Sequence, residues 1–142
     1  MNNYFDMKML ANGKNEAFAR SAVATFALAC SPTLEEINDL KTAVSEAVTN
    51  AIVHAYPDEN GIIELLAEVD ENERSISVSI TDFGCGIADV EAAKEPFFTT
   101  RADDERSGMG FTIIETFTDE MTVRSKVGEG TTVTMKKVFK NA

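Results

Sequence analysis

Small apolar residues recur at intervals of three or four between positions 44 and 55, and this spacing constrains the fold more than any other feature. They are Val44, Ala47, Val48, Ala51, Ile52 and Ala55. On an α-helix they cover one broad arc, which predicts a helix from Thr33 to about Tyr56 that packs this arc against the core. Thr33 and Glu36 have the spacing of a capping box at its start. Pro57 follows its end.

A second line of residues on this helix is polar. Glu46, Asn50 and His54 follow one another four residues apart, just outside the apolar arc, so they lie in line along the helix surface. Glu46 supplies a proton acceptor, and Asn50 supplies a carbonyl oxygen that can bind a metal ion. Such a line is also compatible with an ordinary solvent-exposed face, and the stripe alone does not decide between the two.

The rest of the chain alternates between patterns typical of strands and of helices. We expect strands at residues 4–10, 62–69, 75–82, 121–125 and 131–138, and helices at residues 16–29, near 90 and at 110–117. The acidic turn at residues 70–73 predicts an antiparallel hairpin. Strand pairs adjoin in the sequence and the helices cluster. We therefore expect a single domain over residues 1–142, with one sheet and its helices on one face.

The charge of the chain excludes broad classes of partner. A formal net charge of -11 argues against a general nucleic-acid or lipid surface, because both need a basic face. Cys30 and Cys85 lack the spacing of a metal site, and we see no signal peptide and no apolar run of about 18 residues. We therefore expect a cytoplasmic protein without direct contact to nucleic acid or membrane.

Two glycine-containing stretches fall where ligands are often bound. The stretch DFGCG at 82–86 directly follows a strand, so Asp82 can accept a hydrogen bond from an exocyclic amino group such as that of adenine. Gly84 and Gly86 permit close backbone approach. Gly108 and Gly110 flank the start of a helix, whose unpaired N–H groups suit a phosphate. Each stretch alone also fits an ordinary loop or connector.

Three further features carry alternatives. Residues 97–101, FFTTR, lead into an acidic loop with few apolar anchors, which suits a lid over residues 95–107. Thr131 and Thr132 begin the last strand, where threonines are most often ordinary strand residues. Arg20 is the only charged residue between Ala17 and Thr33. It is either a partner contact or a cation that keeps an apolar helix in solution.

Taken together, these motifs carry a family resemblance. Residues 46–132 contain four motifs in a fixed order: E-x-x-x-N, D-x-G-x-G, G-x-G at a helix start, and G-T. This order resembles that of the GHKL superfamily of ATPases and kinases. The stretches VSEAVTNAIVHAY, EPFFTTR and ERSGMGFTIIETF are most similar to its anti-sigma-factor serine kinases, above all the sporulation anti-sigma-F factors. The resemblance covers nearly the whole chain. It implies the Bergerat fold, an α/β (α+β) two-layer sandwich with a mixed, mainly antiparallel sheet.

The resemblance also implies an activity, partners and roles. A member of this branch binds Mg-ATP, forms a homodimer, sequesters a sporulation sigma factor and phosphorylates a serine of its anti-anti-sigma antagonist. By motif, Glu46 would be the catalytic base, Asn50 the Mg²⁺ ligand and Asp82 the reader of the adenine amino group. The other ATP contacts would be Gly84, Gly86, Thr99, Thr100, Arg101, Gly108, Met109, Gly110, Thr131 and Thr132. Arg20 would contact a protein partner.

Other interpretations belong to different classes. An ATP-hydrolysing clamp of the gyrase or chaperone type normally continues into further domains, and a sensor histidine kinase needs partner domains, neither of which we expect within 142 residues. A pure binding module that uses ATP only for shape needs no base. The presence of Glu46 argues against such a module.

Overall fold

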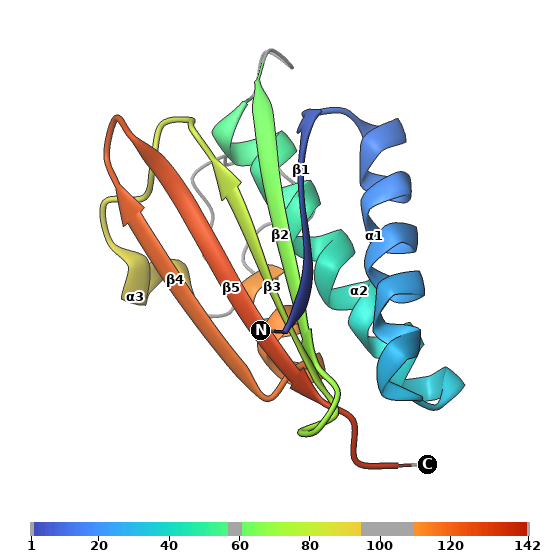
Figure 1. Ribbon diagram of the computed structural model, residues 1–142. Coiled ribbons are helices and arrows are strands. Elements are labelled where there is room, and N and C mark those ends of the chain that lie inside the picture. The colour runs from blue at the N-terminus through green and yellow to red at the C-terminus, as the bar shows by residue number, and fades with distance from the viewer. Residues whose placement is uncertain (1, 57–60, 95–109, 142) are drawn as a thin grey trace.

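The computed structural model describes residues 2–56, 61–94 and 110–141, and its centre is a five-stranded sheet. The strands are β1 (Asn3–Leu10), β2 (Ile62–Asp70), β3 (Ser75–Asp82), β4 (Glu120–Lys126) and β5 (Gly130–Val138). Their order across the sheet is β1-β2-β3-β5-β4 (Figure 1). All four pairings are antiparallel, so the expected mainly antiparallel sheet is confirmed and no parallel pair occurs among the described strands.

Helices cover one face of this sheet. The long helices α1 (Gly13–Ala27) and α2 (Leu34–Asn50) run side by side, and α2 also packs against α4 (Gly110–Phe117) (Figure 1). A short 3-10 turn, Leu28–Cys30, follows α1, and α3 is the single turn Val90–Ala93. The two-layer α/β sandwich is therefore confirmed. In the described ranges no helix is both long and apolar enough to cross a bilayer.

Alternation along β3 shows which face of the sheet the helices cover. Ile76, Val78 and Ile80 are all at most 2% exposed and belong to the core under α1 and α2. Asp82 continues this series at the end of the strand, so its carboxylate lies on the same covered face. A charged group therefore ends a row of core residues.

The opposite face of the sheet is open and carries many hydroxyl groups. Side chains on β3 and β5 form hydrogen-bonded pairs across it: Ser79 with Thr134 at 3.0 Å and Thr81 with Thr132 at 2.9 Å. Toward the β1 edge the same face exposes four large apolar side chains, those of Tyr4, Leu10, Ile62 and Leu66. This apolar area contrasts with the charge of the chain as a whole.

The helix that carries the polar line is not α-helical to its end. It ends as an α-helix at Asn50 and continues as a π-helical turn, Ala51–Ala55, whereas the sequence predicts an α-helix to about Tyr56. A π-helix closes its hydrogen bonds over five residues instead of four. The segment that carries His54 is therefore wound as a π-helix and not as the predicted α-helix.

Glu36 fastens the first turn of α2 to the end of the chain. Its Oε1 accepts a hydrogen bond from the Thr33 N–H at 3.0 Å, and Thr33 Oγ1 accepts one from the Glu36 N–H at 3.2 Å, which confirms the capping box. Its Oε2 accepts hydrogen bonds from the Lys140 and Asn141 N–H groups at 2.8 and 3.3 Å. Burial alone raises the pKa of Glu36, but the hydrogen bonds from Thr33, Lys140 and Asn141 outweigh it and hold that pKa below its usual value.

We predict that Glu36→Ala lowers the free energy of unfolding by about 2 kcal/mol, because it removes a cap and leaves backbone N–H groups without their acceptor. Glu35→Ala, on the exposed side of the same turn, is the matched control. The pKa of Glu36 is lower in the folded protein than in the unfolded chain. The stability that the Glu36 carboxylate contributes is therefore complete above its unfolded-state pKa, and it is lost as the pH falls through its folded-state pKa. Urea denaturation at several pH values measures this. Equal unfolding midpoints for the two variants at neutral pH would contradict the prediction.

Candidate functional site

Asp82 is a buried carboxylate with one oxygen still able to accept a hydrogen bond. It is only 7% exposed, and its Oδ1 accepts hydrogen bonds from the N–H groups of Gly84 at 3.1 Å and Thr131 at 3.2 Å. Its Oδ2 makes no hydrogen bond within the part of the chain that the structure describes. Burial raises the pKa of Asp82, while the two backbone hydrogen bonds oppose that rise. A buried acceptor of this kind suits a donor group on a ligand.

The loop after Asp82 lies against the β4–β5 hairpin. The N–H of Ile87 donates a hydrogen bond to Ser125 Oγ at 2.7 Å. Gly86 has a φ of +76°, and a Cβ there would lie 2.2 Å from the carbonyl oxygen of Lys126. Only glycine lets the loop approach the hairpin this closely, so Gly86 has a structural requirement of its own.

The two threonines at the start of β5 lie on opposite faces of the sheet. Thr131 is 8% exposed on the covered face, where its N–H reaches Asp82. The Thr132 hydroxyl pairs with Thr81 on the open face. The structure therefore brings Thr131 to Asp82 and does not bring Thr132 there. The sequence carries a signal for this distinction, because Thr131 alternates in phase with the apolar residues Val133 and Met135.

At the other end of the candidate site, the last residue of α2 meets the first residue of α4. A Cβ on Gly110 would lie 2.4 Å from Nδ2 and 2.7 Å from Oδ1 of Asn50, so only glycine permits this contact. The first N–H groups of a helix have no intrahelical acceptor, and they favour anions. Glu46 lies one α-helical turn before Asn50 on α2 and is half-buried. A carboxylate, an amide and a helix N-terminus thus come together.

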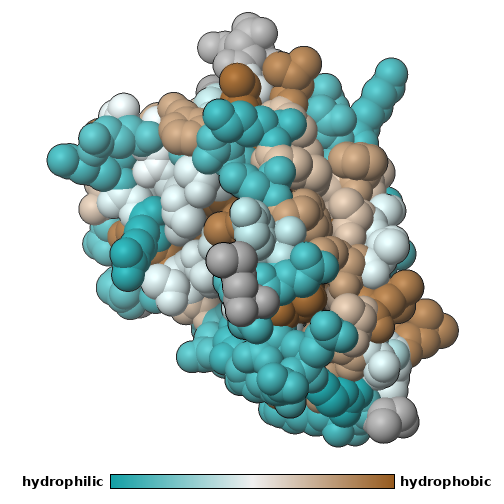
Figure 2. All heavy atoms as spheres, in the orientation of Figure 1, coloured by the Kyte–Doolittle hydropathy of each residue, from teal (hydrophilic) through white to brown (hydrophobic). Residues whose placement is uncertain are grey.

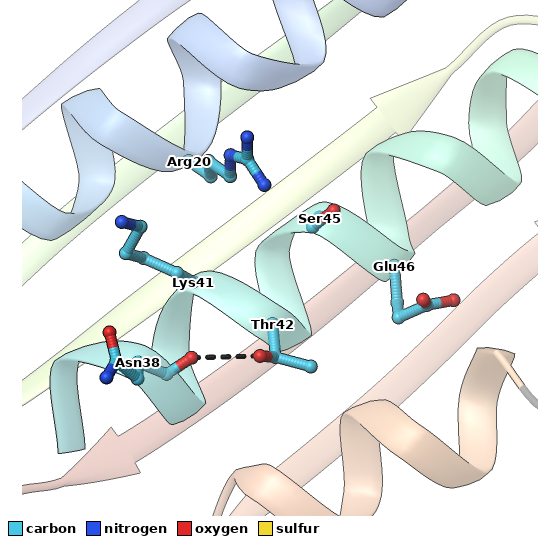
Figure 3. Close-up of a pocket in the computed structure, with 6 residues that line it drawn as sticks. All are labelled: Arg20, Asn38, Lys41, Thr42, Ser45 and Glu46. Atoms are coloured by element: carbon cyan, nitrogen blue, oxygen red, sulfur yellow. Dashed lines mark hydrogen bonds between the residues drawn. The ribbon is translucent and has the colours of Figure 1, made fainter. Parts of the chain in front are cut away.

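A shallow groove of about 310 Å³ runs between α1 and α2 (Figure 3). It is lined by Arg20, Asn38, Lys41, Thr42, Ser45 and Glu46. Figure 3 shows the Arg20 and Lys41 side chains between the two helices, while Glu46 points away from both of them. The Ser45 hydroxyl donates a hydrogen bond to Glu16 of α1, which fixes α2 against α1 just before Glu46. Glu46 therefore lies between a cationic groove and the Asn50–Gly110 contact.

Several expected ATP contacts lie outside the described residues. They are Thr99, Thr100, Arg101, Gly108 and Met109, together with the expected lid at residues 95–107.

The donor set near Asn50 restricts the kind of metal ion that fits. In residues 2–56, 61–94 and 110–141, no group of three or more His, Cys, Asp and Glu side chains could hold a metal. Mg²⁺ usually takes one or two protein ligands and completes its shell with phosphate oxygens and water. The carbonyl oxygen of Asn50 therefore fits a Mg²⁺ ion that arrives with a polyphosphate.

Comparison with known proteins identifies the family. Residues 11–137 match the family described as the histidine kinase-like ATPase domain. A protein named anti-sigma F factor, from Caldanaerobacter subterraneus subsp. tengcongensis, is 52% identical over 96% of this chain and 94% of its own length. The chain belongs to the histidine kinase-like ATPase family, in the branch of the anti-sigma F factors. A second protein of that name, from Clostridium acetobutylicum, is 48% identical over 98% of this chain and 96% of its own length.

Solved structures confirm the fold of this histidine kinase-like ATPase. The RsbU and RsbW domains of a Mycobacterium tuberculosis protein align over 99% of this chain and 33% of that chain, with a TM-score of 0.70 and 18% identity. The mycobacterial sensor histidine kinase MprB aligns over all of both chains, with a TM-score of 0.57 and 16% identity. The family fold implies nucleotide binding.

Two residues near Asp82 were not predicted from the sequence. Ser125 holds the loop through Ile87, and no local pattern distinguishes this serine from other strand residues. Tyr56 donates and accepts hydrogen bonds on the other side of the loop. A sequence signal existed for Tyr56, because a residue with an aromatic ring and a hydroxyl stands directly before Pro57 at the end of the helix.

We predict that Asp82→Asn abolishes or severely weakens ADP binding and leaves the fold intact. An amide can present a donor to the adenine amino group and loses a charge-assisted hydrogen bond, which is worth roughly 1.5–3 kcal/mol. Burial raises the pKa of Asp82 in the folded protein. Ionisation of Asp82 therefore lowers the free energy of unfolding as the pH rises through that pKa. The variant should therefore unfold no more easily than the wild type at neutral pH. Calorimetry with ADP and thermal unfolding test both statements, and undiminished ADP affinity would remove Asp82 from the site.

Proposed function

We propose that this chain is an anti-sigma factor and an ATP-dependent protein-serine kinase. In this proposal it binds Mg-ATP, sequesters a sporulation sigma factor of the F type and phosphorylates a serine of its anti-anti-sigma antagonist. It would act in the cytoplasm, where RNA polymerase and its sigma factors work. The identity of about half with proteins named anti-sigma F factor, over nearly the full length, supports the partner class.

The observation that carries the kinase proposal is the position of Glu46. Binding of a nucleotide needs Asp82 and the N-terminus of α4, but it needs no carboxylate on α2. Glu46 nevertheless lies one turn from Asn50, which contacts Gly110, and it also borders the groove between α1 and α2. A hydroxyl of a bound protein could reach Glu46 from the groove while the nucleotide phosphates lie beside Asn50.

The proposed reaction is an in-line phosphoryl transfer. The serine Oγ attacks the γ-phosphorus of ATP, the bond from that phosphorus to the bridging oxygen breaks, and ADP leaves. Glu46 accepts the serine proton as the new P–O bond forms. Asn50 would hold Mg²⁺, which offsets phosphate charge when it is bound. The N–H groups at the start of α4 would contact the phosphates, and Asp82 would orient the adenine through its Oδ2.

The outer surfaces suit protein partners. Phe18 on α1 is 60% exposed, and Leu28, the first residue of the 3-10 turn after α1, is 59% exposed. Figure 2 shows hydrophobic residues along the side of the molecule where α1 lies. Arg20 is half-buried beside this surface, in the groove. We place the sigma factor and the antagonist on α1 and the groove. A second copy of the chain would cover the apolar area on the open sheet face, which gives the expected homodimer.

We predict that Glu46→Gln abolishes phosphate transfer without preventing ATP binding or sigma-factor capture. The substitution keeps the size of the side chain and removes the proton acceptor, so the transfer rate should fall about 10²–10⁴-fold. The assay incubates the protein with γ-labelled ATP and the antagonist, then measures acid-stable phosphoserine. Glu35→Gln, an exposed position on the same helix, is the control. A near-normal transfer rate for Glu46→Gln would assign the base to another residue, and no phosphoserine with the wild type would contradict the kinase proposal.

We predict that Arg20→Ala weakens binding of the sigma factor and of the antagonist by about tenfold or more, because arginines are frequent anchors of protein interfaces. Lys14→Ala, an exposed cation on the same helix, is the matched control. Surface plasmon resonance with each partner gives the two affinities. If both stay unchanged while the fold is intact, Arg20 serves only to keep the helix in solution.

A further inference from the structure

We infer that Tyr56 is a positioning residue of the nucleotide site, whose hydroxyl ends the β2–β3 ladder directly after Asp82 and leaves one oxygen of that carboxylate available for the adenine amino group. The inference rests on the nucleotide binding in the proposed function. It concerns the last residue of the stretch VSEAVTNAIVHAY, to which the family resemblance assigns no role. It also gives a physical role to the π-helical turn that follows Asn50.

The hydroxyl of Tyr56 lies between two backbone groups that face each other. It donates a hydrogen bond to the carbonyl oxygen of Ile62 at 2.8 Å and accepts one from the N–H of Phe83. The pairing of β2 with β3 ends at Ile63 and Asp82. In the same register, the next pair would be Ile62 and Phe83. The Tyr56 hydroxyl therefore occupies the place of the next direct hydrogen bond in the ladder.

The surroundings hold the Tyr56 ring in this place. A Cβ on Gly61 would lie 2.3 Å from Cδ1 of Tyr56, so the ring packs directly on the backbone at the start of β2. On the other side of the loop, a Cβ on Gly84 would lie 2.4 Å from the carbonyl oxygen of Ala55. The Sγ of Cys85 donates a hydrogen bond to the carbonyl oxygen of His54 at 3.5 Å. The end of the π-helical turn thus contacts the loop at three successive residues.

The end of the β2–β3 ladder at this point determines which oxygen of Asp82 is available to a ligand. In a continued strand, backbone N–H groups lie in the plane of the sheet, whereas side chains stand perpendicular to it. The N–H of Gly84 could not then reach the Asp82 side chain. Because the chain leaves the ladder at Phe83, the Gly84 N–H turns back to Oδ1. Oδ1 is then occupied by Gly84 and Thr131, and Oδ2 is the oxygen that a ligand can use.

The test compares Tyr56→Phe with Tyr4→Phe, the substitution of the only other tyrosine, which is 57% exposed on the open face. Calorimetry measures the affinity of each for ADP and for inosine diphosphate, in which a carbonyl replaces the adenine amino group. Tyr56→Phe should weaken ADP binding about five- to tenfold, the effect of one hydrogen bond, and weaken inosine diphosphate binding much less. The preference for ADP then falls. Tyr4→Phe should preserve both affinities.

The alternative outcomes separate the two levels of the proposal. If Tyr56→Phe has a lower melting temperature but the wild-type preference for ADP, Tyr56 is only structural and the inference is overturned. If the wild type binds ADP no better than inosine diphosphate, the assignment of Asp82 fails as well. If Tyr56→Phe does not fold, amide hydrogen exchange of the wild type decides. The Phe83 N–H should be protected about 100-fold or more although it lies outside β3, and free exchange would overturn the inference.

Discussion

The buried carboxylate of Asp82 is the interaction on which the candidate site depends. Two backbone N–H groups, from the loop after β3 and from the start of β5, converge on one of its oxygens. They fix the loop relative to the last strand and leave the second oxygen for a ligand. Burial raises the pKa of Asp82, so the charged form of this carboxyl is harder to maintain here than in water, while the two backbone hydrogen bonds oppose that rise.

Helix α2 connects this recognition element to the proposed chemistry. Its apolar arc packs in the core, its Glu46–Asn50 pair lies beside the start of α4, and its α1-facing side forms the groove. The π-helical turn at its end then reaches the loop after Asp82. Helix α2 and the π-helical turn after it therefore contact three parts of the proposed site: the adenine end, the phosphate end and the partner surface. In the proposed function, a protein with a net charge of -11 would hold a polyanion through backbone N–H groups and a Mg²⁺ ion, which would supply the local positive charge.

The features predictable from the sequence are those set by local patterns. Strand alternation gave the bounds of β3, and the capping box gave the start of α2, because each depends on residues close together in the chain. The π-helical turn, the Tyr56 bridge and the assignment of Thr131 rather than Thr132 depend on contacts between distant segments. The family resemblance implied that Asn50 and Gly110 belong to one site, but only the packing of α4 on α2 places them in contact.

The central claim is that one nucleotide spans the distance from Asp82 to Asn50 and Gly110. Backbone and side-chain amide NMR during titration tests it most directly, with adenosine first and Mg-ADP second. We predict that adenosine shifts the amide signals of Gly84 and Thr131 and leaves Asn50 and Gly110 unchanged. Mg-ADP should shift all four. Shifts at Asn50 and Gly110 with adenosine, or none at Thr131 with either ligand, would contradict the account.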